Sequence, residues 1–442
     1  MDESKAAKAA IPRNAWNDEE SETENDEPQP IVVDAGSGTF RIGFASDSQP
    51  CHTFPSVLAC KTPATPATPA EYYIGQEAWD NRTDLHLQNP KQMGSVVDWE
   101  CMEKMWHHAF HKVLQVDPKD RRVLLTESSI QYMHKAHRER IAQMMFETFH
   151  VSGLYMRNCI TLCLYASGRT TGLVLSSGCS CTYVMPVYEG HELPHARARV
   201  PYGGSNVTLE LCELLLQSSP VFSSFYQTSS RTQSNDVLVD IKEKYCFVQN
   251  LEHVGGTRPF EASGVRLALL SGRHQRLGAN SSIKTIPTFL LRVVMSFLTF
   301  KKGYKLPNGT QIHLGDELFR ATEQMFSKKD VPKVDFPGLL HQCTMKCDID
   351  LRQDLLKNII VCGRNTCFPG FQERIKQQIE TKYKVNETYQ SKSDVVKVIG
   401  RSDISAWCGG SILASLSTME REWITREDYE EYGPSIVNRK CF

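Results

Sequence analysis

Short apolar runs that end in a polar residue and a glycine-rich turn recur along the chain. Residues 31–33 are Ile-Val-Val, which suits a buried strand, and Asp34 stands where that strand would end. A turn with Gly36 and Gly38 follows, and then a second largely apolar segment. The pattern predicts a strand–turn–strand hairpin over residues 31–44.

Further along, the period of the apolar positions changes from strand to helix and back. Residues 123–127 form an apolar run of strand length, while residues 100–114 and 137–149 carry apolar positions at helical spacing. A strand followed by an amphipathic helix is typical of a βαβ-type unit. This alternation predicts an α/β fold.

The turn of the first hairpin has the chemistry of a phosphate site. Gly36 and Gly38 let the backbone bring its N–H groups, together with the Ser37 hydroxyl, against a phosphate. Asp34 is placed to hold a metal through water, and Arg41 adds a cation on the returning strand. A Gly-Ser-Gly turn also occurs in hairpins without a ligand, so this motif alone leaves both interpretations open.

The overall charge is nearly balanced, with 50 Lys and Arg against 51 Asp and Glu among 442 residues. No net field draws the chain to nucleic acid or to an anionic membrane, so we expect no direct nucleic-acid partner. The apolar stretch 286–300 is short and contains Arg292, so we expect no membrane span. The start of the chain lacks an apolar signal region, so we expect the 15 cysteines to be reduced thiols in the cytosol or nucleus.

Residues 1–30 differ in composition from everything that follows. Residues 18–30 are acidic and almost free of apolar side chains, so they cannot bury enough surface to offset the entropy of ordering. We expect a disordered N-terminal extension. It is either a solvated tail or an interaction arm anchored by Ile11 or Trp16.

A series of ordered segments gives the chain a family resemblance. They are residues 106–108, 145–149, 164–172, 187–190, 193–196, 240–244, 345–350, 409–417 and 433–442. In this order and spacing, the chain resembles the actin and actin-related family from about residue 31 to residue 442. The resemblance implies an α/β fold with two duplicated lobes around a central nucleotide cleft. The first lobe would span 31–165 and the second 166–442, with the C-terminus returning to the first.

The resemblance also implies which residues would hold ATP and Mg²⁺. The second phosphate hairpin would turn near Gly178, the counterpart of residues 31–44. Lys242 and Glu243 match the family's base- and ribose-facing pair, and Gly363 and Phe368 lie on the adenosine side.

Two departures from the family leave nucleotide binding open. Arg364 stands where the family has a second glycine, and Asp403 stands near a position where the family uses lysine. The Arg364 side chain would either fill part of the adenosine pocket or swing out to place positive charge near the phosphates.

The resemblance implies four positions that serve hydrolysis in the family and carry other residues here, while Asp34 is kept. Two aspartates and a histidine of the second hairpin are replaced by Ser176, Cys179 and Tyr183, and the glutamine that positions water is replaced by Cys159. Phosphoryl transfer depends on positioned water and on charge neutralisation by metal, so these exchanges remove its main contributions. We therefore predict a pseudo-ATPase with no catalytic residue.

Two further segments depart from the family. Residues 61–70 carry a proline at every third position where actin has the loop that docks into the next filament subunit, so filament formation is doubtful. Residues 256–300 form an insertion that is a buried helix, a partner-binding segment or an artefact of gene prediction.

Two functional interpretations follow from the resemblance. The first is a cytoplasmic, cytoskeletal structural protein, similar to the divergent actin-like proteins of animal sperm, whose actin-like residues 423–442 meet actin-type or cytoskeletal partners. The alternative is a nuclear scaffold subunit of a chromatin-remodelling or histone-modifying complex. A polymerising ATPase is disfavoured by Cys159, Ser176 and Tyr183.

Overall fold

A computed structural model of the chain describes seven ranges of residues: 28–61, 71–128, 135–249, 302–326, 334–384, 396–400 and 402–441. Three predictions therefore lie outside the described residues. These are the extension up to residue 27, the proline-rich segment from residue 62 to 70, and the insertion 256–300.

The first half of the chain, joined by β19 from the C-terminal part, builds a six-stranded sheet with the order β19-β10-β9-β1-β2-β3. Strands β1 and β2 form the antiparallel hairpin, and β1, β9 and β10 run parallel. The strands are β1 (Ile31–Ala35), β2 (Thr39–Phe44), β3 (His52–Pro55), β9 (Arg122–Glu127), β10 (Gly153–Asn158) and β19 (Ile424–Thr425). The predicted hairpin and the predicted strand 123–127 are thus present.

A second sheet repeats this topology with the order β13-β12-β11-β17-β18, and β14 lies beside β12. Here β11 and β12 form the hairpin, and β11, β17 and β18 run parallel. The strands are β11 (Gly172–Ser177), β12 (Thr182–Tyr188), β13 (His191–Glu192), β14 (Ala198–Val200), β17 (Ile359–Cys362) and β18 (Val398–Gly400). The α/β fold prediction is confirmed, and the molecule contains one sheet arrangement twice.

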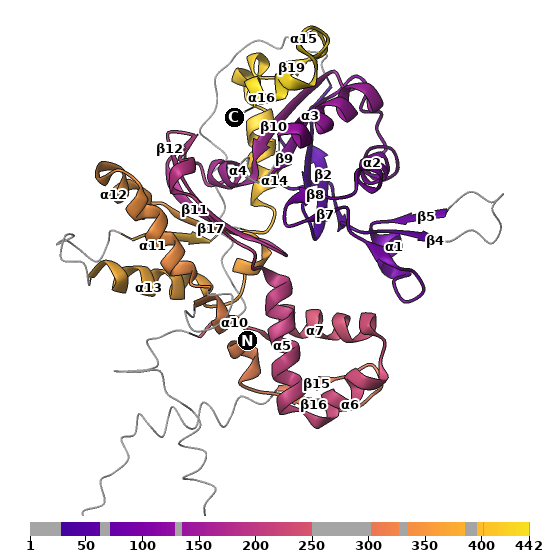
Figure 1. Cartoon of the computed structure of the whole chain (residues 1–442), viewed down its shortest axis with the longest axis vertical. Helices are drawn as coiled ribbons and strands as arrows, with labels where there is room; N and C mark the ends of the chain where they lie inside the picture. The colour runs from indigo at the N-terminus through magenta and orange to yellow at the C-terminus, as the bar shows by residue number, and fades with distance from the viewer. Residues whose placement is uncertain are drawn as a thin grey trace, which may run out of the picture.

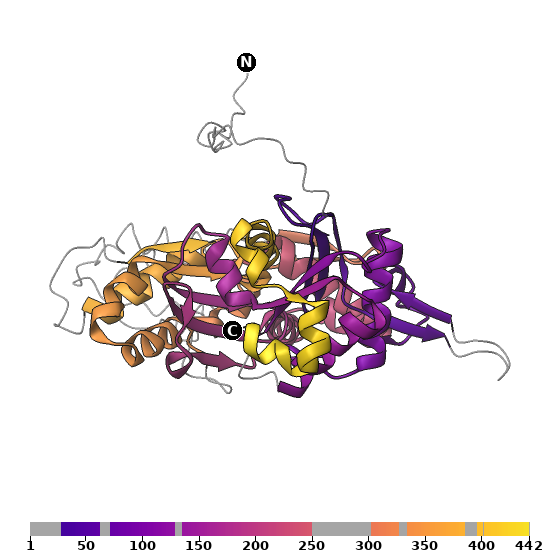
Figure 2. The same cartoon turned by 90° about the horizontal axis from the view of Figure 1, so that it is seen from above.

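Helices cover both sheets and build the outer parts of the molecule (Figures 1 and 2). Around the first sheet lie α2 (Trp99–His107), α3 (Lys135–Gln143), α4 (Cys159–Tyr165), α14 (Ser405–Ala414), α15 (Arg426–Tyr432) and α16 (Val437–Lys440). The second half adds α5 (Gly204–Ser218), α6 (Pro220–Thr228), α7 (Arg231–Tyr245), α10 (Glu317–Glu323), α11 (Phe336–Lys346), α12 (Ile349–Lys357) and α13 (Phe371–Lys384).

The two predicted helices of the first half change their winding before they end. Helix α2 continues as a π-helical turn over His108–Val113, and α3 continues as another over Met144–Thr148. The helical period of the sequence therefore identified both elements, although not the wider last turns.

Three small groups of strands lie outside the two large sheets. One group, with α1 (Gln76–Asp80), projects from the first sheet and contains β4 (Leu58–Lys61), β5 (Glu71–Ile74) and β6 (Leu87–Gln88) (Figure 1). Strands β7 (Lys91–Gln92) and β8 (Ser95–Val96) form a short hairpin. The third group, β15 (Lys302–Lys305) and β16 (Gln311–Leu314), lies beside α6 in the second half (Figure 1).

Helices α4 and α14 pack against each other where the two sheets meet (Figure 1). The contact is so close that a Cβ atom on Gly409 would lie 1.8 Å from the Leu162 carbonyl oxygen, so only glycine fits. The buried Trp407 donates its indole N–H to the Val32 carbonyl at 2.9 Å. This helix pair thus fixes the hairpin strand β1 to the centre of the molecule.

Within the described ranges, no helix is long and apolar enough to cross a membrane.

Candidate functional site

The turn of the first hairpin is closed by the backbone N–H of Gly36, which donates to the Thr39 carbonyl at 3.0 Å. The Ser37 carbonyl accepts a hydrogen bond from the Asn89 side chain. Gly38 faces the second hairpin, because a Cβ atom added to it would lie 3.2 Å from Cβ of Cys179. The three predicted phosphate-binding residues therefore do form a tight turn, and its tip meets the tip of the second hairpin.

Asp34 and Arg41 form a buried ion pair across the two strands of the first hairpin. They are direct neighbours in the strand register, with Arg41 Nη1 3.0 Å from Asp34 Oδ2. The other carboxylate oxygen of Asp34 accepts a hydrogen bond from the Thr126 hydroxyl at 2.6 Å. Arg41 Nη2 lies 3.1 Å from Asp403 Oδ2, so a second carboxylate holds the same guanidinium.

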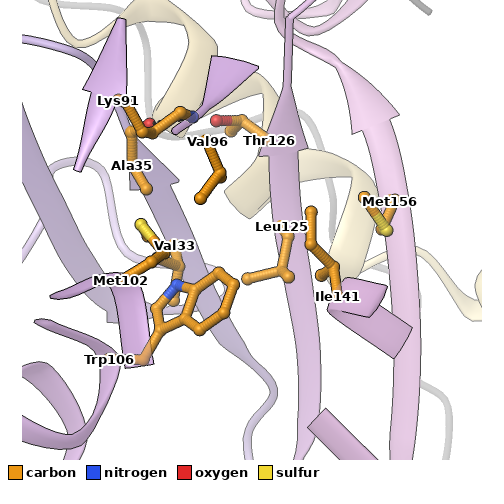
Figure 3. A pocket seen from close by; sticks show the side chains of 10 residues that line it. All are labelled: Val33, Ala35, Lys91, Val96, Met102, Trp106, Leu125, Thr126, Ile141 and Met156. Carbon is orange, nitrogen blue, oxygen red and sulfur yellow. Dashed lines mark hydrogen bonds between the residues drawn. The ribbon is translucent and has the colours of Figure 1, made fainter. Parts of the chain in front are cut away.

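Lys91, which the sequence did not single out, lies below this hairpin. Its side chain is buried, and the ammonium group donates to the carbonyl of Ala35 at 2.5 Å. Burial lowers the pKa of Lys91, and the nearby Asp34 carboxylate opposes that shift. Lys91, Ala35 and Thr126 line a cavity of about 20 Å³ with apolar side chains around it, room for one water molecule (Figure 3).

The second hairpin has the same turn without the charges. The N–H of Gly178 donates to the Cys181 carbonyl at 3.0 Å. The Gly178 carbonyl accepts the N–H of Gly204 at 2.9 Å, and the Cys179 carbonyl accepts the N–H of Ser205 at 2.9 Å. The first N–H groups of α5 are therefore already bonded to the hairpin.

Ser176 and Tyr183 are register neighbours in this hairpin, as Asp34 and Arg41 are in the first. The Tyr183 hydroxyl reaches across to the first half and donates to the Met93 carbonyl at 3.2 Å. Tyr183 therefore connects the two halves.

Cys159, which the resemblance places at a glutamine, begins helix α4 and is partly buried. Burial raises the pKa of its thiol, and the Asp34 carboxylate raises it further. The side chain is therefore an uncharged thiol at neutral pH. A neutral thiol is a weak hydrogen-bonding group and lacks the amide's paired donor and acceptor for a water molecule.

On the adenosine side, the predicted pair is already engaged. Lys242 Nζ donates to the Gly204 carbonyl at 3.2 Å and to the Thr208 hydroxyl at 2.9 Å. Glu243 Oε2 lies 3.1 Å from Nη2 of Arg364, whose side chain is 61% exposed. The structure thus holds the Arg364 guanidinium at Glu243, and the two positions predicted for it toward a nucleotide stay predictions.

Gly363 and Phe368 lie on the loop after β17. Gly363 has a φ of 87°, and a Cβ atom there would lie 2.4 Å from the Ser177 carbonyl, so the position requires glycine. Phe368 is partly buried and packs against the core of the second half.

One contact between the halves carried no sequence signal. Arg82, just after α1, forms a two-pronged ion pair with Asp236 on α7, with Nη2 2.7 Å and Nε 2.9 Å from the same carboxylate oxygen. The two residues are 154 positions apart, so only the folded chain brings them together.

The residues present do not favour a divalent cation at Asp34. Both carboxylate oxygens of Asp34 already accept hydrogen bonds, and the matching position of the second hairpin carries Ser176 rather than a carboxylate. Among the described residues, no three His, Cys, Asp or Glu side chains are grouped as metal ligands.

A comparison with known protein families agrees with the duplicated hairpin sheets. The family model of actin matches residues 25–442, almost the whole chain. The match includes both hairpins, the helix pair α4 and α14, and the adenosine-side loop. The chain therefore belongs to the actin family.

Proposed function

We propose that this protein is a structural, cytoskeletal member of the actin family that binds ATP weakly or statically and hydrolyses it poorly or not at all. The observation that carries the proposal is the chemistry of the side chains at the positions that the resemblance assigns to hydrolysis. Cys159 is a partly buried neutral thiol, Ser176 carries no charge, and Tyr183 bonds the Met93 backbone of the other half.

The size of the expected loss follows from the chemistry of phosphoryl transfer. The reaction requires an aligned water molecule and stabilisation of the charge that develops on the transferred group. Removing one preorganised donor of this kind typically costs about 10²- to 10³-fold in rate. Three altered positions therefore support a rate near that of the uncatalysed reaction.

Static binding of ATP remains compatible with the site. A nucleotide would have to separate Arg364 from Glu243, and both side chains of this pair are well exposed. Exposed ion pairs contribute at most about 1 kcal/mol, so the separation costs little. Arg41 is different, because it would have to turn from two buried or half-buried carboxylates.

For partners, we propose actin-type or cytoskeletal proteins that meet the C-terminal segment 423–442. This segment contributes β19 to the first sheet and continues into α15 and α16, where Tyr432 is 44% exposed. The proposed location is the cytoplasm. Exclusive nuclear enrichment with chromatin complexes would contradict this and support a nuclear scaffold role.

The hydrolysis proposal is tested by restoring the family's residues. Phosphate release from ATP is measured for the full chain and for the triple variant C159Q/S176D/Y183H, with C51Q as a control at an exposed thiol outside the hairpins. We expect background rates for the wild type and C51Q and a higher rate for the triple variant if it folds. A wild-type rate clearly above background contradicts the proposal, whatever the variant does.

A further inference from the structure

The buried Lys91 has no task in the proposed function. It lies on β7, only 8% exposed, and its ammonium group bonds the Ala35 carbonyl. Figure 3 shows its nitrogen between Ala35 and Thr126, and the Thr126 hydroxyl in turn bonds Asp34. The lysine therefore places a positive charge directly behind the carboxylate that the family resemblance assigns to the metal site.

A single guanidinium serves two carboxylates at the first hairpin, because Arg41 pairs with both Asp34 and Asp403. Lys91 supplies a second cation, and its charge interacts with that of Asp34. Among the described residues, no ion pair uses Lys91, so its charge acts through the field alone.

The positive charges of Arg41 and Lys91 would oppose the binding of a divalent cation at Asp34. The cation would have to sit next to Asp34 while the Arg41 guanidinium and the Lys91 ammonium remain close by, and like charges at short range in a buried site repel strongly. It would also find both oxygens of Asp34 occupied by Arg41 and Thr126.

We propose that Lys91 and Arg41 take the place of the divalent cation, so that the site binds a nucleoside polyphosphate as the metal-free anion. This rests on the proposed function only in assuming a nucleotide ligand. The exclusion of a divalent cation from the hairpin stands without it.

The nucleotide arm of the test measures ATP affinity of the full chain by calorimetry, once with Mg²⁺ and once with EDTA. For the wild type we expect the two dissociation constants to agree within about threefold. For Lys91→Met, which keeps the side-chain length without the charge, we expect binding at least about tenfold tighter with Mg²⁺ than with EDTA. Wild-type binding that is tenfold tighter with Mg²⁺ overturns the proposal.

The second arm needs no nucleotide. Mn²⁺ is added to the protein and its binding is followed by electron paramagnetic resonance, with the urea midpoint measured in parallel in Mn²⁺ and in EDTA. We expect the wild type and Asp34→Asn to bind the same amount of Mn²⁺, which means that Asp34 holds none. The urea midpoint of the wild type should be equal in Mn²⁺ and in EDTA. A wild-type Mn²⁺ site that disappears in Asp34→Asn overturns the proposal even if Lys91→Met does not fold.

Two variants serve as controls. Lys91→Arg keeps the charge and should behave as the wild type, while Lys61→Met removes an exposed lysine that lies 4.0 Å from Glu71 and should change nothing. ATP binding that is absent in both buffers would contradict the nucleotide part of the proposed function, and the Mn²⁺ arm would still decide the role of Lys91.

Discussion

The two hairpins of this molecule share a backbone and differ in their chemistry. Asp34 in the first hairpin and Ser176 in the second occupy equivalent strand positions. In each hairpin the N–H two residues later closes the turn with a hydrogen bond of 3.0 Å, and the strand register pairs the equivalent residue with the residue seven positions later. In the first hairpin the pair is Asp34 and Arg41, which form a buried ion pair. In the second it is Ser176 and Tyr183, which carry no charge at neutral pH.

The second hairpin is held by neutral hydrogen bonds instead. The hydroxyls of Ser177 and Thr182 lie 2.6 Å apart, Thr182 donates to the Tyr202 carbonyl, and Asn365 donates to Ser177 at 2.9 Å. A glycine turn and a strand register thus preserve the backbone while the side chains change from charged to neutral. The first hairpin therefore pairs its charged side chains within the fold, and the second joins neutral ones.

Removing the key residue of each hairpin gives the largest expected contrast. Asp34→Ala leaves Arg41 buried with only Asp403, and breaking a buried ion pair should lower the free energy of unfolding by about 3 kcal/mol. Ser176→Ala, at the equivalent position, should cost less than about 1 kcal/mol. Urea denaturation of both variants measures the difference, and equal losses would mean that the hairpins do not differ in this way.

The next contrast is the pH dependence contributed by a buried acid of the first half. Burial raises the pKa of Glu127 to about 7, against the opposing effect of Arg138. Because the folded-state pKa lies above the unfolded value, this contribution to stability is complete below about pH 4.5 and is lost as the pH rises through 7. Relative to Glu127→Gln, the wild type should lose about 1–3 kcal/mol between pH 5 and 7.5. Urea midpoints across this window measure the effect, and parallel curves for the two proteins would contradict it.

Tyr183→Phe removes the hydroxyl with which the second hairpin reaches the first half. The loss of its bond to the Met93 carbonyl should cost about 1 kcal/mol and speed hydrogen exchange in the segment around Met93. Tyr188→Phe, on the same strand and only partly buried, is the matched control. Unchanged exchange around Met93 would show that Tyr183 does not join the halves.

The smallest expected effect is the coupling between Arg82 and Asp236. The side chains are 23% and 28% exposed, so a double-mutant cycle with alanine should give about 0.5–1 kcal/mol. The same cycle on Arg320 and Asp316, an ion pair more than half exposed within one helix, should give less. A larger coupling energy for Arg320 and Asp316 than for Arg82 and Asp236 would contradict the expectation that the Arg82 ion pair helps to hold the two halves together.

What the sequence could predict was largely local. The hairpin strands, the strand at 123–127 and the positions of Gly36, Ser37 and Gly38 follow from periodicity and turn chemistry within a few residues, and the structure contains them. Family resemblance extended this to the duplicated fold, because it compares the whole order of segments.

The contacts that define the site could not be predicted in the same way. Arg41 and Asp403 are 362 positions apart, and the sequence marks Asp403 only as an unexpected acid. Lys91 carries no motif at all, and its position became informative only when the fold placed it behind Asp34. Charge pairing between distant segments depends on the packing of complete sheets, which periodicity does not encode.

The central claim is that a member of the actin family has kept the fold without the hydrolytic chemistry. The most direct measurement denatures the purified full chain and quantifies the released adenine nucleotides by chromatography. We predict ATP without appreciable ADP, or no nucleotide. ADP in near-stoichiometric amount would contradict the claim, because it would show that the altered positions still support hydrolysis.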